Sequence, residues 1–127
     1  MHYKMRDQIR FKIGKEEKNI QEKWIEIPEG TEHIQMMIEM PEEFRYMAFL
    51  FLEDPKKEIR FQKLLGYGQQ NPGIGKSTKD TTIGGVPGEI YPGTWKIGIG
   101  IFTEYVAQKL GEQTGEIVLT VSERCGF

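Results

Sequence analysis

Short runs in which apolar and polar residues alternate one by one constrain the fold of this chain more than any other feature. Residues 7–13 read Asp-Gln-Ile-Arg-Phe-Lys-Ile, with apolar side chains on one side and polar side chains on the other. Residues 94–102 alternate in the same way, and Trp95 is the first of the residues that we expect to face inward. A period of two is that of a β-strand with one buried face.

Proline, glycine and charged clusters separate these runs and predict the turns between strands. We expect strands over residues 7–13, 20–27, 33–40, 45–52, 58–65, 94–102 and 117–121. Residues 81–83 fit a further short edge strand, and residues 105–115 fit either a helix or an exposed strand extension. Residues 45–52 are almost continuously apolar, which predicts a strand that is buried on both faces.

Many short strands joined by tight turns are typical of an all-β fold. We therefore predict an antiparallel β-sandwich or jelly roll of about seven to eight strands. A length of 127 residues suits one domain with one hydrophobic core, so we expect a single domain over residues 1–127.

The charges of the chain are balanced and interspersed. With 17 basic and 19 acidic residues the net charge is −2, which does not attract nucleic acid. No apolar run approaches the roughly 18 residues that a membrane-spanning helix needs. Residues 1–10 are polar and carry no apolar signal segment, so we expect a cytoplasmic protein.

The residues that most often carry metal or covalent chemistry are few. The chain has one cysteine, Cys125, and two histidines, His2 and His33, and it contains no His-x-His or Cys-x-x-Cys pair. We therefore expect no catalytic residue, no metal site and no cofactor. Residues 53–54 are acidic and would suit calcium, but two lysines follow closely and favour a structural turn.

The longest segment without strand character covers residues 66–93, where seven glycines and three prolines precede Gly93. A long irregular segment in a small domain is usually functional or disordered. Its aromatic and basic residues, together with Tyr105 further along, predict a ligand-binding surface. The candidate ligand-binding residues are Tyr67, Lys76, Tyr91 and Tyr105.

Residues 73–78 read Gly-Ile-Gly-Lys-Ser-Thr and are similar to the phosphate-binding loop of nucleoside triphosphatases. That loop has a glycine where this chain has Gln70, and it leads into a helix. The residues after Ser77 are a poor helix start. A nucleotide-binding enzyme that uses the Gly75-Lys76-Ser77 loop is therefore an alternative, and a flexible surface loop is the simpler interpretation.

Residues 84–100 read Gly-Gly-Val-Pro-Gly-Glu-Ile-Tyr-Pro-Gly-Thr-Trp-Lys-Ile-Gly-Ile-Gly. This stretch resembles the β-rich domain that precedes the metal-dependent phosphoesterase domain in CehA/McbA-type PHP metallohydrolases. Residues 24–32, with their Pro-Glu-Gly turn, and residues 51–55 are similar to further pieces of that domain in the same order. The Pro-Gly-Thr-Trp turn is also similar to bacterial pre-peptidase C-terminal domains.

The resemblance covers roughly residues 20–121 and implies an accessory β-module rather than an enzyme. The metal ligands of that family lie in a following domain that opens with a His-x-His element, and this chain contains none of them. We expect a non-catalytic accessory or binding module whose partner is a PHP-type catalytic domain. A carbohydrate- or small-ligand-binding sandwich and a homo-oligomer formed through a strand edge are the other expectations.

Overall fold

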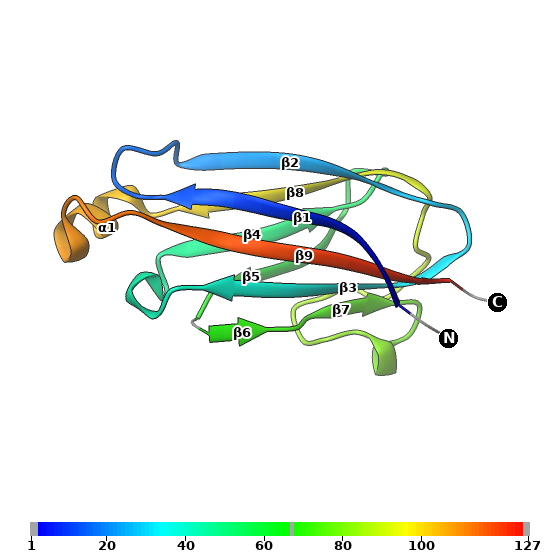
Figure 1. Cartoon of the computed structure of the whole chain (residues 1–127). Helices are drawn as coiled ribbons and strands as arrows, with labels where there is room; N and C mark the ends of the chain where they lie inside the picture. Colours follow the sequence, from blue (N-terminus) through cyan, green and yellow to red (C-terminus); the bar gives the residue numbers. More distant parts are fainter. Residues whose placement is uncertain (1–2, 67, 126–127) are drawn as a thin grey trace.

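The computed structural model describes the backbone of residues 3–66 and 68–125 and the side chains of residues 7–66 and 70–125. Two antiparallel sheets pack face to face, and one short helix lies at the left end of the sandwich in Figure 1. The elements are β1 (Tyr3–Ile13), β2 (Ile20–Ile27), β3 (Thr31–Met40), η1 (Glu42–Phe44), β4 (Ala48–Glu53), β5 (Ile59–Leu64), β6 (Gly68–Gln70), β7 (Gly73–Gly75), η2 (Thr78–Asp80), β8 (Gly93–Ile101), α1 (Thr103–Leu110) and β9 (Gly115–Cys125).

Sheet A has the strand order β1-β9-β3-β6, and β7 pairs with β3 beside β6. Sheet B has the order β2-β8-β4-β5. Apart from the β4–β5 hairpin and the β6–β7 pair, successive strands cross from one sheet to the other, which is the connectivity of a jelly roll (Figure 1). The predicted all-β antiparallel sandwich is confirmed, and β6 and β7 share one strand position.

The inward-facing residues of both sheets form one hydrophobic core. Its largest fully buried side chains are Trp95, Phe11, Phe44 and Phe61. The alternation that predicted Trp95 as a core residue is confirmed, since its side chain is 0 % exposed. Among the described residues no helix has the length and apolar character needed to cross a membrane.

The expectation for residues 45–52 is wrong in two respects. Tyr46 has a φ of 65°, which a strand does not tolerate, and β4 begins only at Ala48. Leu50 and Leu52 are buried in the core, whereas Phe49 and Phe51 are only half-buried on the outer side of sheet B. A two-layer sandwich covers each sheet on one face alone, so the outer phenylalanines keep contact with solvent.

The segment 66–93 also differs from its prediction. Residues 81–83 form no strand, and the segment contributes the short strands β6 and β7 instead. The backbone N–H of Val86 donates to the carbonyl of Arg60 at 2.8 Å, so this segment covers part of the outer edge of β5. Short glycine-rich strands carry too little alternation to be detected from sequence.

Residues 105–115, left open between helix and strand, contain most of α1. The helix buries Val106 against the core and ends at Gly111, whose φ of 58° only glycine adopts readily.

The outer edge of β2 offers the backbone groups through which a homo-oligomer could pair. Lys23 lies opposite Ile97 and therefore on the inner side of this edge strand. An inward-pointing charge opposes the addition of another strand. Assembly through this edge is therefore disfavoured, and a homo-oligomer stays a prediction.

Candidate binding surface

Exposed apolar side chains are distributed unequally between the two sheets. Within sheet A, none of the residues whose side chains are described has an exposed large apolar side chain. The exposed ones belong to sheet B or to the segments that border it: Ile20, Trp24, Tyr46, Ile59, Leu64, Ile83, Val86, Phe102 and Tyr105. A concentration of apolar side chains on one face is typical of an interaction surface.

The strand register arranges the outer side of sheet B into rows, because residues directly opposite each other point to the same face. One row is Ile20, Gly100, Phe49 and Leu64, and a second row is Trp24, Lys96, Glu53 and Ile59. Between them lies a row of Glu22, Gly98, Phe51 and Gln62. We call these twelve outward-facing residues the sheet B face.

Two glycines of β8 lower the middle of the sheet B face. A Cβ atom at Gly98 would lie 2.0 Å from Cζ of Phe51, so the phenyl ring occupies the space that a side chain would need. At Gly100 nothing lies within 4 Å of such a Cβ, and the surface between Ile20 and Phe49 stays open. The Phe51 ring therefore covers β8 at Gly98, whereas β8 stays uncovered at Gly100.

Replacing Gly98 with alanine is expected to lower the free energy of unfolding by about 1–2 kcal/mol, because the Phe51 ring has to leave its position. The matched change Gly100→Ala meets open space and is expected to be neutral or to stabilise by about 0.5–1 kcal/mol. Equilibrium unfolding in urea measures both values. Equal effects of the two changes would contradict this account of the Phe51 position.

A chain of charges crosses the sheet B face beside Trp24. The Lys96 ammonium lies 3.0 Å from the Glu22 carboxylate and 3.7 Å from that of Glu53. The hydrogen bond to Glu22 raises the pKa of Lys96 above its ordinary 10.5, with the charges of Glu22 and Glu53 adding to it, although desolvation lowers it. Lys96 therefore stays protonated at neutral pH and holds both carboxylates in place.

The turn after β4 fixes one end of this face through a buried ion pair. Asp54 accepts hydrogen bonds from the backbone N–H groups of Lys56 and Glu58, and its other oxygen lies 3.3 Å from Nη1 of Arg60. Arg60 also donates to the backbone carbonyls of Val86 and Glu89. Asp54 is thus part of a structural turn that ties the segment 84–92 to sheet B, whereas Glu53 is the last residue of β4.

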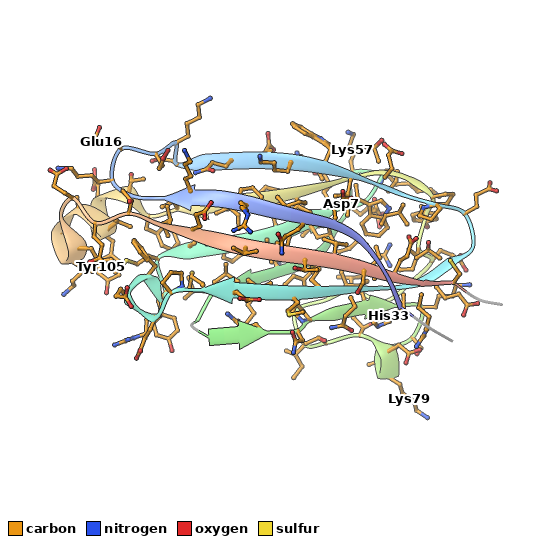
Figure 2. The ribbon with its side chains drawn as sticks, viewed as in Figure 1. Asp7, Glu16, His33, Lys57, Lys79 and Tyr105 are labelled. Atoms are coloured by element: carbon orange, nitrogen blue, oxygen red, sulfur yellow. The ribbon has the colours of Figure 1, made fainter. Side chains whose placement is uncertain are left out.

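The structure does not bring the predicted ligand-binding residues together. Tyr67 lies outside the described residues. Tyr91 sits under the Lys56 ammonium, 4.2 Å from its ring centroid, whereas Tyr105 lies on α1. Figure 2 shows that Tyr105 and Lys57, the neighbour of Lys56, lie toward opposite ends of the sandwich.

The fourth predicted residue, Lys76, lies at the end of the sandwich where the chain turns from β2 into β3. It is 3.9 Å from the Glu32 carboxylate and lines a hollow of about 380 Å³. Glu89 and Pro92, which lie close to Tyr91 in sequence, line the same hollow. Lys76 and the Tyr91 segment are therefore neighbours, and both are remote from α1.

The segment similar to a phosphate-binding loop has a different structure here. Residues 73–75 are β7, and the three-residue η2 follows at Thr78–Asp80 in place of an α-helix. The N–H groups of Gly73 and Gly75 donate to the hydroxyls of Thr82 and Thr81. These backbone donors are therefore engaged within the protein and do not form the cradle that a phosphate group requires.

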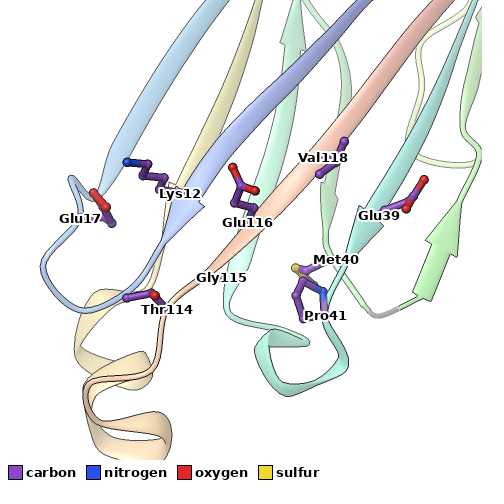
Figure 3. A pocket seen from close by; sticks show the side chains of 9 residues that line it. All are labelled: Lys12, Glu17, Glu39, Met40, Pro41, Thr114, Gly115, Glu116 and Val118. Atoms are coloured by element: carbon purple, nitrogen blue, oxygen red, sulfur yellow. The ribbon is translucent and has the colours of Figure 1, made fainter.

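A hollow of about 1000 Å³ lies on sheet A and is shown in Figure 3. Its polar walls come from Lys12, Glu17, Glu39 and Glu116, and it contains no aromatic side chain. Glu116 is also 3.5 Å from Arg10. Carboxylates on an open surface are ordinarily solvated, and nothing else at this hollow indicates a ligand.

Residues of the sheet B face were missed by the sequence interpretation. Trp24 is 60 % exposed because it alternates with the buried Ile25. Phe49 and Phe51 were assigned to a fully buried strand. The sequence did indicate this exposure, because a strand that is apolar on both faces has to leave one of them uncovered in a two-layer fold.

Comparison with models of known protein families and with curated proteins found no match for this chain. The resemblance to the accessory domain of PHP metallohydrolases therefore stays a prediction. Within the described residues, no group of three or more histidine, cysteine or acidic side chains is placed to hold a metal ion.

Proposed function

We propose that this chain is a non-catalytic binding module that contacts its partner through the sheet B face. The observation that carries the proposal is the unequal distribution of exposed apolar side chains, which are gathered on and around sheet B. Exposed aromatic and aliphatic residues around a core of half-buried phenylalanines resemble the composition of protein binding surfaces.

The chemistry of the face supports binding rather than catalysis. A nucleophile or a general base needs an activating neighbour. Glu22 and Glu53, two of the carboxylates in this region, are both held by Lys96. Cys125 lies on β9 in sheet A, the other layer of the sandwich.

The partner suggested by the sequence resemblance is a PHP-type catalytic domain, which the module would position or hold. An apolar face of this kind suits such a role because it can pack against a second domain. The cytoplasmic location expected from the sequence belongs to the same proposal.

The proposal is tested by screening the chain against immobilised glycans, peptides and purified PHP-type catalytic domains. The variant Ile20→Ser with Leu64→Ser changes the sheet B face, and Arg10→Ser with Thr120→Ser is the matched control on sheet A. We expect each saturable interaction with a peptide or protein partner to weaken by at least about 10-fold in the sheet B variant and to persist in the control.

Two results would contradict the proposal. The first is that the sheet B variant binds every partner as tightly as the natural sequence does, or that only the sheet A variant loses binding. The second is a ligand that mass spectrometry shows to be chemically altered after incubation, because a binding module leaves its ligand unchanged.

A further inference from the structure

A small hollow opens at one corner of the sheet B face, beside the turn after β4. Its volume is about 340 Å³, within the range of small-molecule sites. Trp24 forms one wall, Lys96 and Thr94 of β8 form the floor, and Glu53 stands on the opposite side. The turn residue Lys57 closes one end.

The strand register sets the distance across this hollow. Trp24, Lys96 and Glu53 lie directly opposite one another on three adjacent strands. Adjacent strands are about 4.8 Å apart, so the backbone positions of Trp24 and Glu53 are roughly 10 Å apart. A flat ring can therefore lie over the floor with one side against the indole and its edge near the carboxylate.

The indole is the apolar part of the site. Trp24 is 60 % exposed, although tryptophan is largely buried on average. Its exposure has a local cause, because Trp24 alternates with the buried Ile25 and Ile27 and therefore points away from the core. An exposed, rigid aromatic ring beside fixed polar groups suits a ligand that has one apolar face and a polar edge.

The polar groups of the site are held in position before any ligand arrives. Lys96 is fixed between Glu22 and Glu53, and the Thr94 hydroxyl donates to the Glu26 carboxylate. Groups that are already oriented lose little conformational entropy when a ligand binds. Carboxylates accept hydrogen bonds from hydroxyl groups, and an ammonium donates to them.

The charge of the surroundings narrows the ligand class. The charged side chains on or beside the hollow are Glu22, Glu26, Glu53, Asp54, Lys57 and Lys96, and Asp54 is paired with Arg60. Apart from Asp54, three carboxylates face two ammonium groups, which disfavours phosphates and acidic sugars. A purely apolar ligand would displace water from these polar groups without replacing the hydrogen bonds that the water makes.

We propose that the Trp24 hollow binds a neutral sugar ring, stacked on the indole with its hydroxyl groups directed at Glu53, Lys96 and Thr94. The inference rests on the proposed function, because it assigns a ligand class to one corner of the same sheet B face. A neutral sugar has an apolar C–H face that suits the indole. It also has an uncharged polar edge that suits the fixed carboxylate, ammonium and hydroxyl groups.

The test is titration of the full chain with three neutral hexasaccharides, built of glucose, mannose and xylose, and with the acidic polygalacturonate. Tryptophan fluorescence and calorimetry are the readouts. The other tryptophan, Trp95, is fully buried, so a change in emission reports on Trp24. We expect saturable binding of at least one neutral hexasaccharide and none of polygalacturonate.

Variants separate this site from the rest of the surface. Trp24→Ala is expected to weaken the affinity by about 30-fold or more, and Trp24→Phe by less, because a smaller ring remains. Tyr105→Ala removes another exposed aromatic side chain, on α1, and should leave the affinity unchanged. Circular dichroism confirms that each variant is folded.

The inference is overturned if none of the neutral hexasaccharides binds, if polygalacturonate is the only ligand, or if Trp24→Ala binds as tightly as the natural sequence. These results leave the proposed function standing when a protein partner still loses affinity on Ile20→Ser with Leu64→Ser. Failure of that serine variant to weaken any interaction with a peptide or protein partner overturns the proposed function itself.

Discussion

Replacing Trp95 with alanine is expected to lower the free energy of unfolding by about 3–5 kcal/mol, the usual range for a buried tryptophan. Trp95 is the largest fully buried side chain and lies near the start of β8, the strand between β2 and β4. Its indole N–H donates to the backbone carbonyl of Tyr91 at 2.7 Å, and the Arg60 guanidinium lies 5.4 Å from its ring centroid. The change removes a large apolar volume and leaves a carbonyl without its donor.

The matched control is Trp24→Ala, which removes the same side chain from the exposed side of the neighbouring strand. We expect it to change the free energy of unfolding by no more than about 0.5 kcal/mol. Urea unfolding followed by far-ultraviolet circular dichroism compares the two, because tryptophan fluorescence is altered in both. Similar losses for both variants would show that the two tryptophans do not differ in burial as described.

Replacing Asp54 with alanine is expected to lower the free energy of unfolding by about 3–5 kcal/mol, as the removal of one partner from a buried ion pair does. Asp54 is 2 % exposed and Arg60 is 3 % exposed, so the remaining guanidinium cannot regain water without opening the fold. Nη2 of Arg60 already has no hydrogen-bond partner among the described residues. The turn hydrogen bonds to Lys56 and Glu58 are lost at the same time.

Two comparisons isolate the buried charge. Glu42→Ala breaks an exposed ion pair with Arg45 and should cost less than about 1 kcal/mol. The double change Asp54→Ala with Arg60→Met removes both buried charges and is expected to cost less than the sum of the single changes. Guanidinium chloride is unsuitable because it screens ion pairs, so urea unfolding is the measurement. A loss for Asp54→Ala no larger than for Glu42→Ala would refute the role of this pair.

The buried pair of Asp54 and Arg60 also explains why the sheet B face has a fixed shape. Arg60 links the turn after β4 to the segment 84–92 and packs over the indole of Trp95. The same turn supplies Lys57 to the Trp24 hollow. Loss of the ion pair should therefore disturb the corner in which we propose sugar binding, whereas the hollow on sheet A should be unaffected.

Much of the strand pattern could be predicted from alternation alone. The strands over residues 7–13, 20–27 and 94–102 match β1, β2 and β8 closely, because each has one face in the core and the other toward solvent. The prediction of strands and helices failed in segments where apolar and polar residues do not alternate in this way. β7 contains glycine at two of three positions, and α1 is too short for its helical period to stand out.

The candidate site was predicted less well than the fold. Sequence reasoning placed it on residues chosen by composition, Tyr67, Lys76, Tyr91 and Tyr105, which are adjacent to glycine-rich or irregular segments. Tyr91 and Tyr105 proved to be far apart, because Tyr91 precedes β8 and Tyr105 follows it, so the whole length of that strand separates them. Proximity along the chain is a weak guide to proximity in a fold dominated by long-range strand pairs.

By itself the sequence determined the fold class, the core position of Trp95 and the turn role of Asp54, because each follows from local periodicity or local charge. Only the tertiary structure decided which outer face stays uncovered and which residues meet there. Trp24, Lys96 and Glu53 are separated by up to 72 positions along the chain, and the register of β2, β8 and β4 places them in one row. Strand register across non-consecutive strands depends on the packing of the whole core, which no local pattern encodes.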